Sequence, residues 1–96
     1  MPPHELPYVA TEAFLETYVG LLDDTIDVLD PQLDALLRGG YAEARFRRDR
    51  VQGESGGAFI LSVPTSAGTV WHVYWDFSDS QHAEIVFIAL VEIAGP

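Results

Sequence analysis

Four polar side chains are predicted to share one face of two neighbouring strands. His72, Tyr74 and Asp76 alternate along the segment 70–77, and a period of two puts alternate residues on the same face of a strand. A three-residue hairpin loop would pair Ser62 with His72 and bring its hydroxyl to that face. Because the unperturbed pKa of histidine lies near neutral pH, this face could carry general acid–base chemistry.

The second candidate feature is a strip of arginines in an acidic chain. Fifteen acidic residues face only five basic ones, and the formal net charge is −10. Four of the five basic residues fall within six positions, namely Arg45, Arg47, Arg48 and Arg50. Guanidinium groups pair bidentately with carboxylate or phosphate. The strip therefore predicts an anion-binding surface, and either pair, Arg45/Arg47 or Arg48/Arg50, could face His72.

A catalytic interpretation gives each of these residues a role. His72 would act as the general acid or base, Asp76 would orient it, and an arginine such as Arg48 would stabilise phosphate charge. The binding surface would be completed by Arg45, Arg47, Arg50, Ser62 and Tyr74. The alternative is structural, with a hydrogen-bonded surface histidine, a packed tyrosine and a solvent-facing acid.

Length and composition predict a single domain over residues 1–96, with residues 1–7 as a loose lead-in. The chain has no cysteine, which excludes disulfides and thiolate metal sites. No apolar run reaches membrane-spanning length, so we expect a cytoplasmic protein. Many acids between positions 12 and 34 are spaced by three or four residues, namely Glu12, Glu16, Asp23, Asp27, Asp30 and Asp34. This pattern is typical of a solvated helix face, and we expect neither a metal site nor a cofactor.

The N-terminal half has helical periodicity. Thr11 is a predicted N-cap, and apolar spacing favours one helix from Glu12 to about Leu29, with Gly20 as a weak point and an end near Leu22 as the alternative. Asp30-Pro31 predicts the start of a second helix. Gly39-Gly40 would end it, so that the two helices pack as an antiparallel hairpin.

The C-terminal half alternates with the period of strands. We predict long strands at 43–52, 58–65, 70–77 and 84–92 and a possible short one at 8–10. The expected fold is therefore α+β, a helical hairpin on a four-stranded antiparallel sheet. Trp71 and Trp75 lie on its predicted core face, opposite Val63 and Phe59. The run 85–91 is apolar at both parities, which predicts burial on both faces and a central place in the sheet.

The order of a short strand, a helical hairpin and a run of strands resembles the RelE/ParE toxin superfamily. The resemblance lies in residues 8–14 (YVATEAF), 47–51 (RRDRV), 57–63 (GAFILSV) and 73–75 (VYW). It implies a toxin, intact or degenerate, that acts on RNA at the ribosome or on gyrase and is neutralised by an antitoxin. If the chain is an enzyme, the resemblance implies a metal-independent ribonuclease. His72 stands where such ribonucleases are expected to have a second arginine.

The acidic composition favours a different class, a non-catalytic binding protein. An inhibitor, an immunity-type protein or a nucleic-acid mimic would present its carboxylates to a basic partner. The arginine strip would then be structural and pair with Glu43, Asp49 or Asp76. Both hypotheses predict a small protein partner, and both leave the oligomeric state open.

Overall fold

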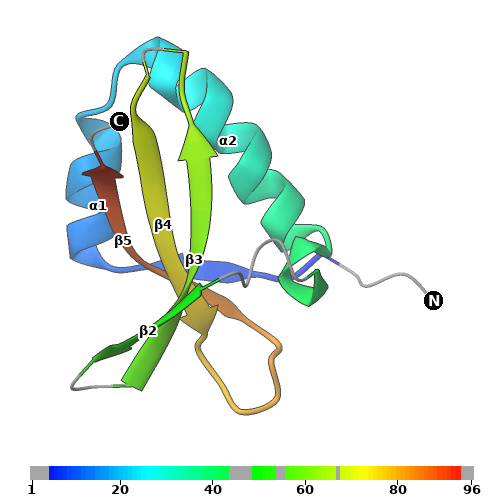
Figure 1. The fold of residues 1–96 in the computed structure, drawn as a ribbon. Coiled ribbons are helices and arrows are strands. Elements are labelled where there is room, and N and C mark those ends of the chain that lie inside the picture. Colours follow the sequence, from blue (N-terminus) through cyan, green and yellow to red (C-terminus); the bar gives the residue numbers. More distant parts are fainter. Residues whose placement is uncertain (1–4, 44–48, 54–55, 67, 94–96) are drawn as a thin grey trace.

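The computed structural model describes residues 5–43, 49–53, 56–66 and 68–93. They form an α+β fold in which two helices are followed by a run of strands (Figure 1). The elements are β1 (Tyr8–Ala10), α1 (Glu12–Val19), α2 (Asp23–Leu37), the 3-10 helix η1 (Gly40–Ala42), β2 (Asp49–Gly53), β3 (Gly56–Pro64), β4 (Val70–Phe77) and β5 (Ile85–Ile93).

The sheet is mixed, which corrects the antiparallel sheet expected from the sequence. Its strand order is β1-β5-β4-β3-β2. Neighbours from β2 to β5 are antiparallel, whereas β1 pairs with β5 in parallel. Parallel neighbours need a long crossover connection, and here the helices and the other strands provide it. The short N-terminal strand is therefore present, and it makes one edge of a five-stranded sheet.

The register of β3 and β4 confirms the predicted pairing. Val63 lies opposite Trp71 and Phe59 opposite Trp75, and the Thr65 N–H donates to the Thr69 carbonyl oxygen at 2.9 Å. Of the first long strand, expected at 43–52, the structure describes Asp49–Gly53 as β2. Glu43 lies in a bend after η1 and not in a strand, and residues 44–48 lie outside the described residues.

A β-bulge in β5 changes which residues face the core. Trp75 pairs with Phe87 but Tyr74 pairs with Ala89, so Ile88 has no opposite residue in β4. Both Phe87 and Leu90 are consequently buried although they are three positions apart. Val91 on the other parity remains 39% exposed. β5 lies inside the sheet as expected, but the prediction that both its faces are buried is wrong.

The helix boundaries differ from those that local signals predicted. α1 ends at Val19 with Gly20 as its C-cap, and α2 runs through Pro31 without a restart at Asp30. Glycine is a poor helix former, and acids at Asp23 and Asp24 favour a helix N-terminus there. The helix continues past the proline because Leu29 and Leu36, on either side of it, are both fully buried.

Other helix ends agree with prediction. The Thr11 hydroxyl accepts a hydrogen bond from the Phe14 N–H at 3.1 Å and donates one to the Ile88 carbonyl at 2.6 Å. It therefore caps α1 and fastens it to the bulge of β5. α2 ends at Leu37, with Arg38 as its C-cap and Gly39 at φ 132°, a conformation that favours glycine.

The two helices pack on the sheet side by side instead of closing on each other as a tight hairpin. α1 lies against β5, whereas α2 approaches β3, and in Figure 1 they diverge from the turn that joins them. Phe14 of α1 and Leu29 of α2 join one buried cluster with Val73 and Trp75 of β4.

Candidate functional site: the sheet face and the interhelical pocket

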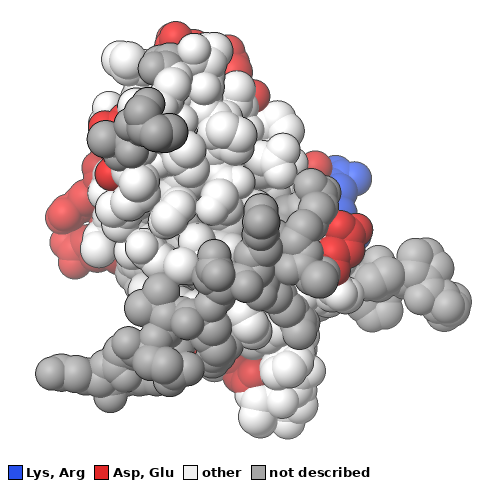
Figure 2. Space-filling view, viewed as in Figure 1, with Lys and Arg blue, Asp and Glu red and all other residues white. Residues whose placement is uncertain are grey.

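The predicted polar face exists, but its neighbours are mainly apolar. Ser62 lies opposite His72, and on the other side of β4 His72 pairs with Val91 and Tyr74 with Ala89. The rings of His72 and Tyr74 meet edge to face, with centroids 6.3 Å apart. In Figure 2 the described surface over the strands is largely uncharged, and acidic side chains lie around its margin.

Asp76 is poorly placed to orient His72. The two residues are four positions apart on β4, and a rise of about 3.3 Å per residue separates their Cα atoms by about 13 Å. The Asp76 carboxylate instead accepts a hydrogen bond from the Phe77 N–H at 2.8 Å. A direct pair between His72 and Asp76 is therefore not formed, and their catalytic roles remain predictions.

Most of the arginine strip lies outside the described residues. This applies to Arg45, Arg47 and Arg48. The backbone of Arg50 is described, and it pairs with Phe59, which in turn lies opposite Trp75. Arg50 is therefore at a position of the Trp75 face of the sheet and not of the Tyr74 face. Of the strip, the described residues therefore place only the Arg50 backbone, and which arginines face His72 stays a prediction.

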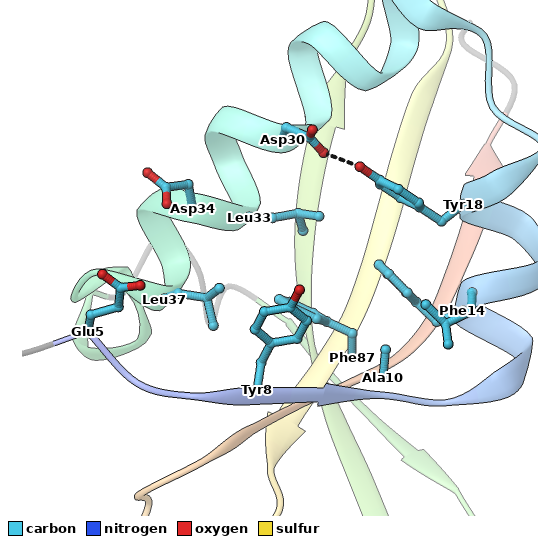
Figure 3. A pocket seen from close by; sticks show the side chains of 11 residues that line it. Glu5, Tyr8, Ala10, Phe14, Tyr18, Asp30, Leu33, Asp34, Leu37 and Phe87 are labelled. Carbon is cyan, nitrogen blue, oxygen red and sulfur yellow. Dashed lines mark hydrogen bonds between the residues drawn. The ribbon is translucent and has the colours of Figure 1, made fainter.

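A pocket of about 440 Å³ lies between the two helices. We call it the interhelical pocket (Figure 3). Its volume falls within the range of small-ligand sites, about 300–1,000 Å³. Aliphatic side chains of both helices line it, with Leu15 from α1 and Leu33 and Leu37 from α2.

Four aromatic rings line the same pocket, from three elements. Phe14 and Phe87 stack with centroids 5.2 Å apart and are almost fully buried. The ring centroids of Tyr8 and Phe87 lie 5.4 Å apart, and the stacked rings of Tyr18 and Phe14 have centroids 6.1 Å apart. Tyr8 is 57% exposed. The pocket therefore has a buried phenylalanine floor and a tyrosine ring open to an incoming group.

Three carboxylates belong to the pocket lining, those of Glu5, Asp30 and Asp34. The Tyr18 hydroxyl donates to Asp30 at 2.6 Å and so links α1 to α2 (Figure 3). This bond, with partial burial and the negative charge of Asp30, raises the pKa of the Tyr18 phenol to about 12. The phenol therefore stays protonated and holds the Asp30 carboxylate in place.

Arg38, which is not part of the pocket lining, pairs with the Asp34 carboxylate. Its Nε lies 2.9 Å from Asp34 Oδ2, in a pair whose side chains are 64% and 57% exposed. The hydrogen bond and charge of Asp34, with Glu5 nearby, raise the pKa of the guanidinium. In Figure 2 the blue atoms of a basic side chain stand beside red acidic atoms near the C-terminal end of α2.

Sequence reasoning missed the interhelical pocket. Asp30 and Asp34 were grouped with the solvated acids of a helix face, and Tyr8 was assigned only to a short strand. The three acids and three of the four aromatic residues that line the pocket lie within residues 5–34 of the sequence. Their spacing predicts a pocket only when the two helices are known to diverge.

No protein-family model matches this chain, and neither a curated protein nor a solved structure shows significant similarity to it. Within the described residues, no group of three or more His, Asp or Glu side chains could hold a metal ion. No helix in that part of the chain is long and apolar enough to cross a membrane.

Proposed function

We propose that this chain is a non-catalytic binding protein that docks a basic segment of a protein partner in the interhelical pocket. The observation that carries this proposal is the pocket itself, which combines an aromatic and aliphatic interior with three carboxylates. A net charge of −10 adds a long-range field that attracts a basic partner and speeds its association. Apolar burial supplies affinity, and the carboxylates select for positive charge.

The surface next to the pocket favours a macromolecular partner. Leu15 lines the pocket and is 48% exposed, and Val19, one helical turn later, is 78% exposed. Residues four apart lie on the same side of a helix. The apolar surface therefore continues from the pocket along α1, where a bound segment would cover it.

The first test compares two charge-neutralising double variants. A labelled peptide of alternating leucine and basic residues is titrated with the protein, and binding is followed by fluorescence anisotropy. Asp30→Asn with Asp34→Asn should weaken binding about fivefold or more, a loss of about 1 kcal/mol. Asparagine at position 30 keeps an acceptor for the Tyr18 hydroxyl.

The matched control is Glu16→Gln with Asp27→Asn, which removes the same charge from exposed positions outside the pocket lining. It should change binding much less. Equal effects of both double variants would mean that the field alone attracts the peptide. Failure of the wild-type protein to prefer the basic peptide over a glutamate-containing counterpart would refute the proposal.

The order of elements favours a second candidate function. β1, two helices and a run of antiparallel strands follow one another, as in the order on which the resemblance to RelE/ParE toxins was based. Such a toxin would act on RNA at the ribosome or on gyrase, and an antitoxin would neutralise it. Induction in bacteria should then arrest growth, and His72→Ala or Arg48→Ala should relieve the arrest. Normal growth on induction of the wild-type chain would rule this candidate out.

A further inference from the structure

The aromatic rings and carboxylates of the interhelical pocket together suit one particular cation. Tyr8 presents an exposed ring at the pocket, and Tyr18 places a second ring beside the Asp30 carboxylate. Cations are attracted to aromatic faces, and planar guanidinium groups stack on them more readily than ammonium groups do. A carboxylate next to a ring can pair with the edge of a guanidinium whose face lies on the ring.

One carboxylate of the pocket lining, that of Asp34, already pairs with a guanidinium on the outer side of α2. Arg38 Nε binds Asp34 through one carboxylate oxygen, and both side chains are largely exposed. Such a pair exchanges readily, since exposed ion pairs are weakly held. Arg38 is therefore a competitor that an incoming guanidinium could displace.

We infer that the interhelical pocket recognises an arginine side chain of the protein partner. This rests on the proposed function and names the group that it binds. The guanidinium stacks on Tyr8 and pairs with Asp30 or Asp34, and apolar residues next to that arginine cover Leu15 and Val19. A lysine ammonium has the charge but neither the planar face nor the bidentate edge, and it is more strongly hydrated.

The experiment compares two blocked peptides, Ac-Gly-Leu-Arg-Leu-Gly-NH₂ and its lysine counterpart, by NMR or calorimetric titration of the full chain. The arginine peptide should bind about threefold to tenfold more tightly, as expected for added stacking and bidentate pairing. Tyr8→Leu keeps an apolar group but removes the ring. It should reduce the preference for arginine to about twofold or less and leave lysine-peptide binding nearly unchanged.

A second variant tests the competition from Arg38. Arg38→Gln frees Asp34 and should tighten binding of the arginine peptide about twofold to threefold. Gln81→Glu is the matched control, because it makes the net charge more negative by the same amount at an exposed position outside the pocket lining. It should have a smaller effect.

The outcomes separate the two proposals. Equal binding of both peptides, unchanged by Tyr8→Leu, would overturn arginine recognition and leave a general preference for basic segments. Binding of neither peptide would overturn both proposals. Free arginine bound as tightly as the arginine peptide would show that the flanking apolar residues contribute nothing and would contradict a protein segment as the ligand.

Discussion

Trp75 is the largest of the fully buried side chains in the described core. Its side chain is fully buried, between the rings of Phe59 at 5.0 Å and Phe77 at 5.5 Å. Trp71 lies on the same face of β4 but is only partly buried at the edge of the cluster. The two tryptophans therefore form an internal comparison between a central and a peripheral position.

We predict that Trp75→Ala lowers the free energy of unfolding by about 3–5 kcal/mol, because a buried ring is replaced by a cavity. Trp71→Ala should cause a smaller loss. Urea unfolding followed by circular dichroism measures both. A loss below about 1 kcal/mol at position 75 would contradict the burial of this ring.

Tyr18 links stability to alkaline pH. Its pKa is raised from 10.0 to about 12, mainly by the hydrogen bond to Asp30. The folded protein therefore keeps a proton that the unfolded chain releases. The stability from this bond is fully present below about pH 10 and is lost as the pH rises from about 10 to about 12.

The corresponding test is Tyr18→Phe, which removes the hydroxyl and leaves the ring. At pH 8 the variant should be less stable by about 1 kcal/mol, the usual value of a net hydrogen bond. That difference should shrink as the pH approaches 12. Chemical unfolding at several pH values measures it, and a difference that grows with pH would contradict the assignment.

At the scale of elements, α2 contains an unfavourable residue that packing outweighs. Pro31 has no N–H to donate to the Asp27 carbonyl, and its ring disfavours a straight helix. The helix nevertheless extends from Asp23 to Leu37. Leu29 and Leu36 are both 0% exposed, and their burial needs a continuous helix across the proline.

We therefore predict that Pro31→Ala stabilises the protein by about 1–2 kcal/mol. The gain of about 3 kcal/mol in helix propensity is reduced by greater freedom of the unfolded chain. Pro64→Ala, at the exposed end of β3, is the control and should change stability little. Thermal unfolding compares the two, and a destabilised Pro31→Ala variant would indicate that α2 depends on the proline.

For the whole molecule, the dominant property is an excess of negative charge. The net charge is −10, and the one ion pair found among the described side chains is the exposed one between Arg38 and Asp34. Like charges at this density repel one another in the compact state. The charge that would attract a basic partner therefore also weakens the fold at low ionic strength.

We predict that salt affects stability and binding in opposite directions. Raising NaCl from about 10 to about 150 mM screens the repulsion and should increase Tm, by about 4–8 °C for each kcal/mol gained. The same change should weaken binding of a basic peptide. Glu16→Gln with Asp27→Asn reduces the charge and should show a smaller rise in Tm. A Tm independent of salt would refute the repulsion argument.

Local pattern was sufficient for several parts of this fold. Alternation in β3 and β4 placed Trp75 in the core and paired Ser62 with His72, since a shift of one residue would expose every apolar side chain. The cap at Thr11 and the end of α2 before Gly39 were also predictable. Each depends on the chemistry of a few adjacent residues.

Only the tertiary structure decided the remaining features, because they depend on contacts between distant segments. Burial of Leu29 and Leu36 keeps α2 helical across Pro31. The bulge at Ile88, whose carbonyl accepts a hydrogen bond from Thr11, changes which residues of β5 face the core. The pocket lies between α1, which packs on β5, and α2, which approaches β3, and the hydrogen bond from Tyr18 to Asp30 joins the two helices across it. The sequence by itself determined which faces are apolar, whereas packing determined which acids border a binding pocket and which face only water.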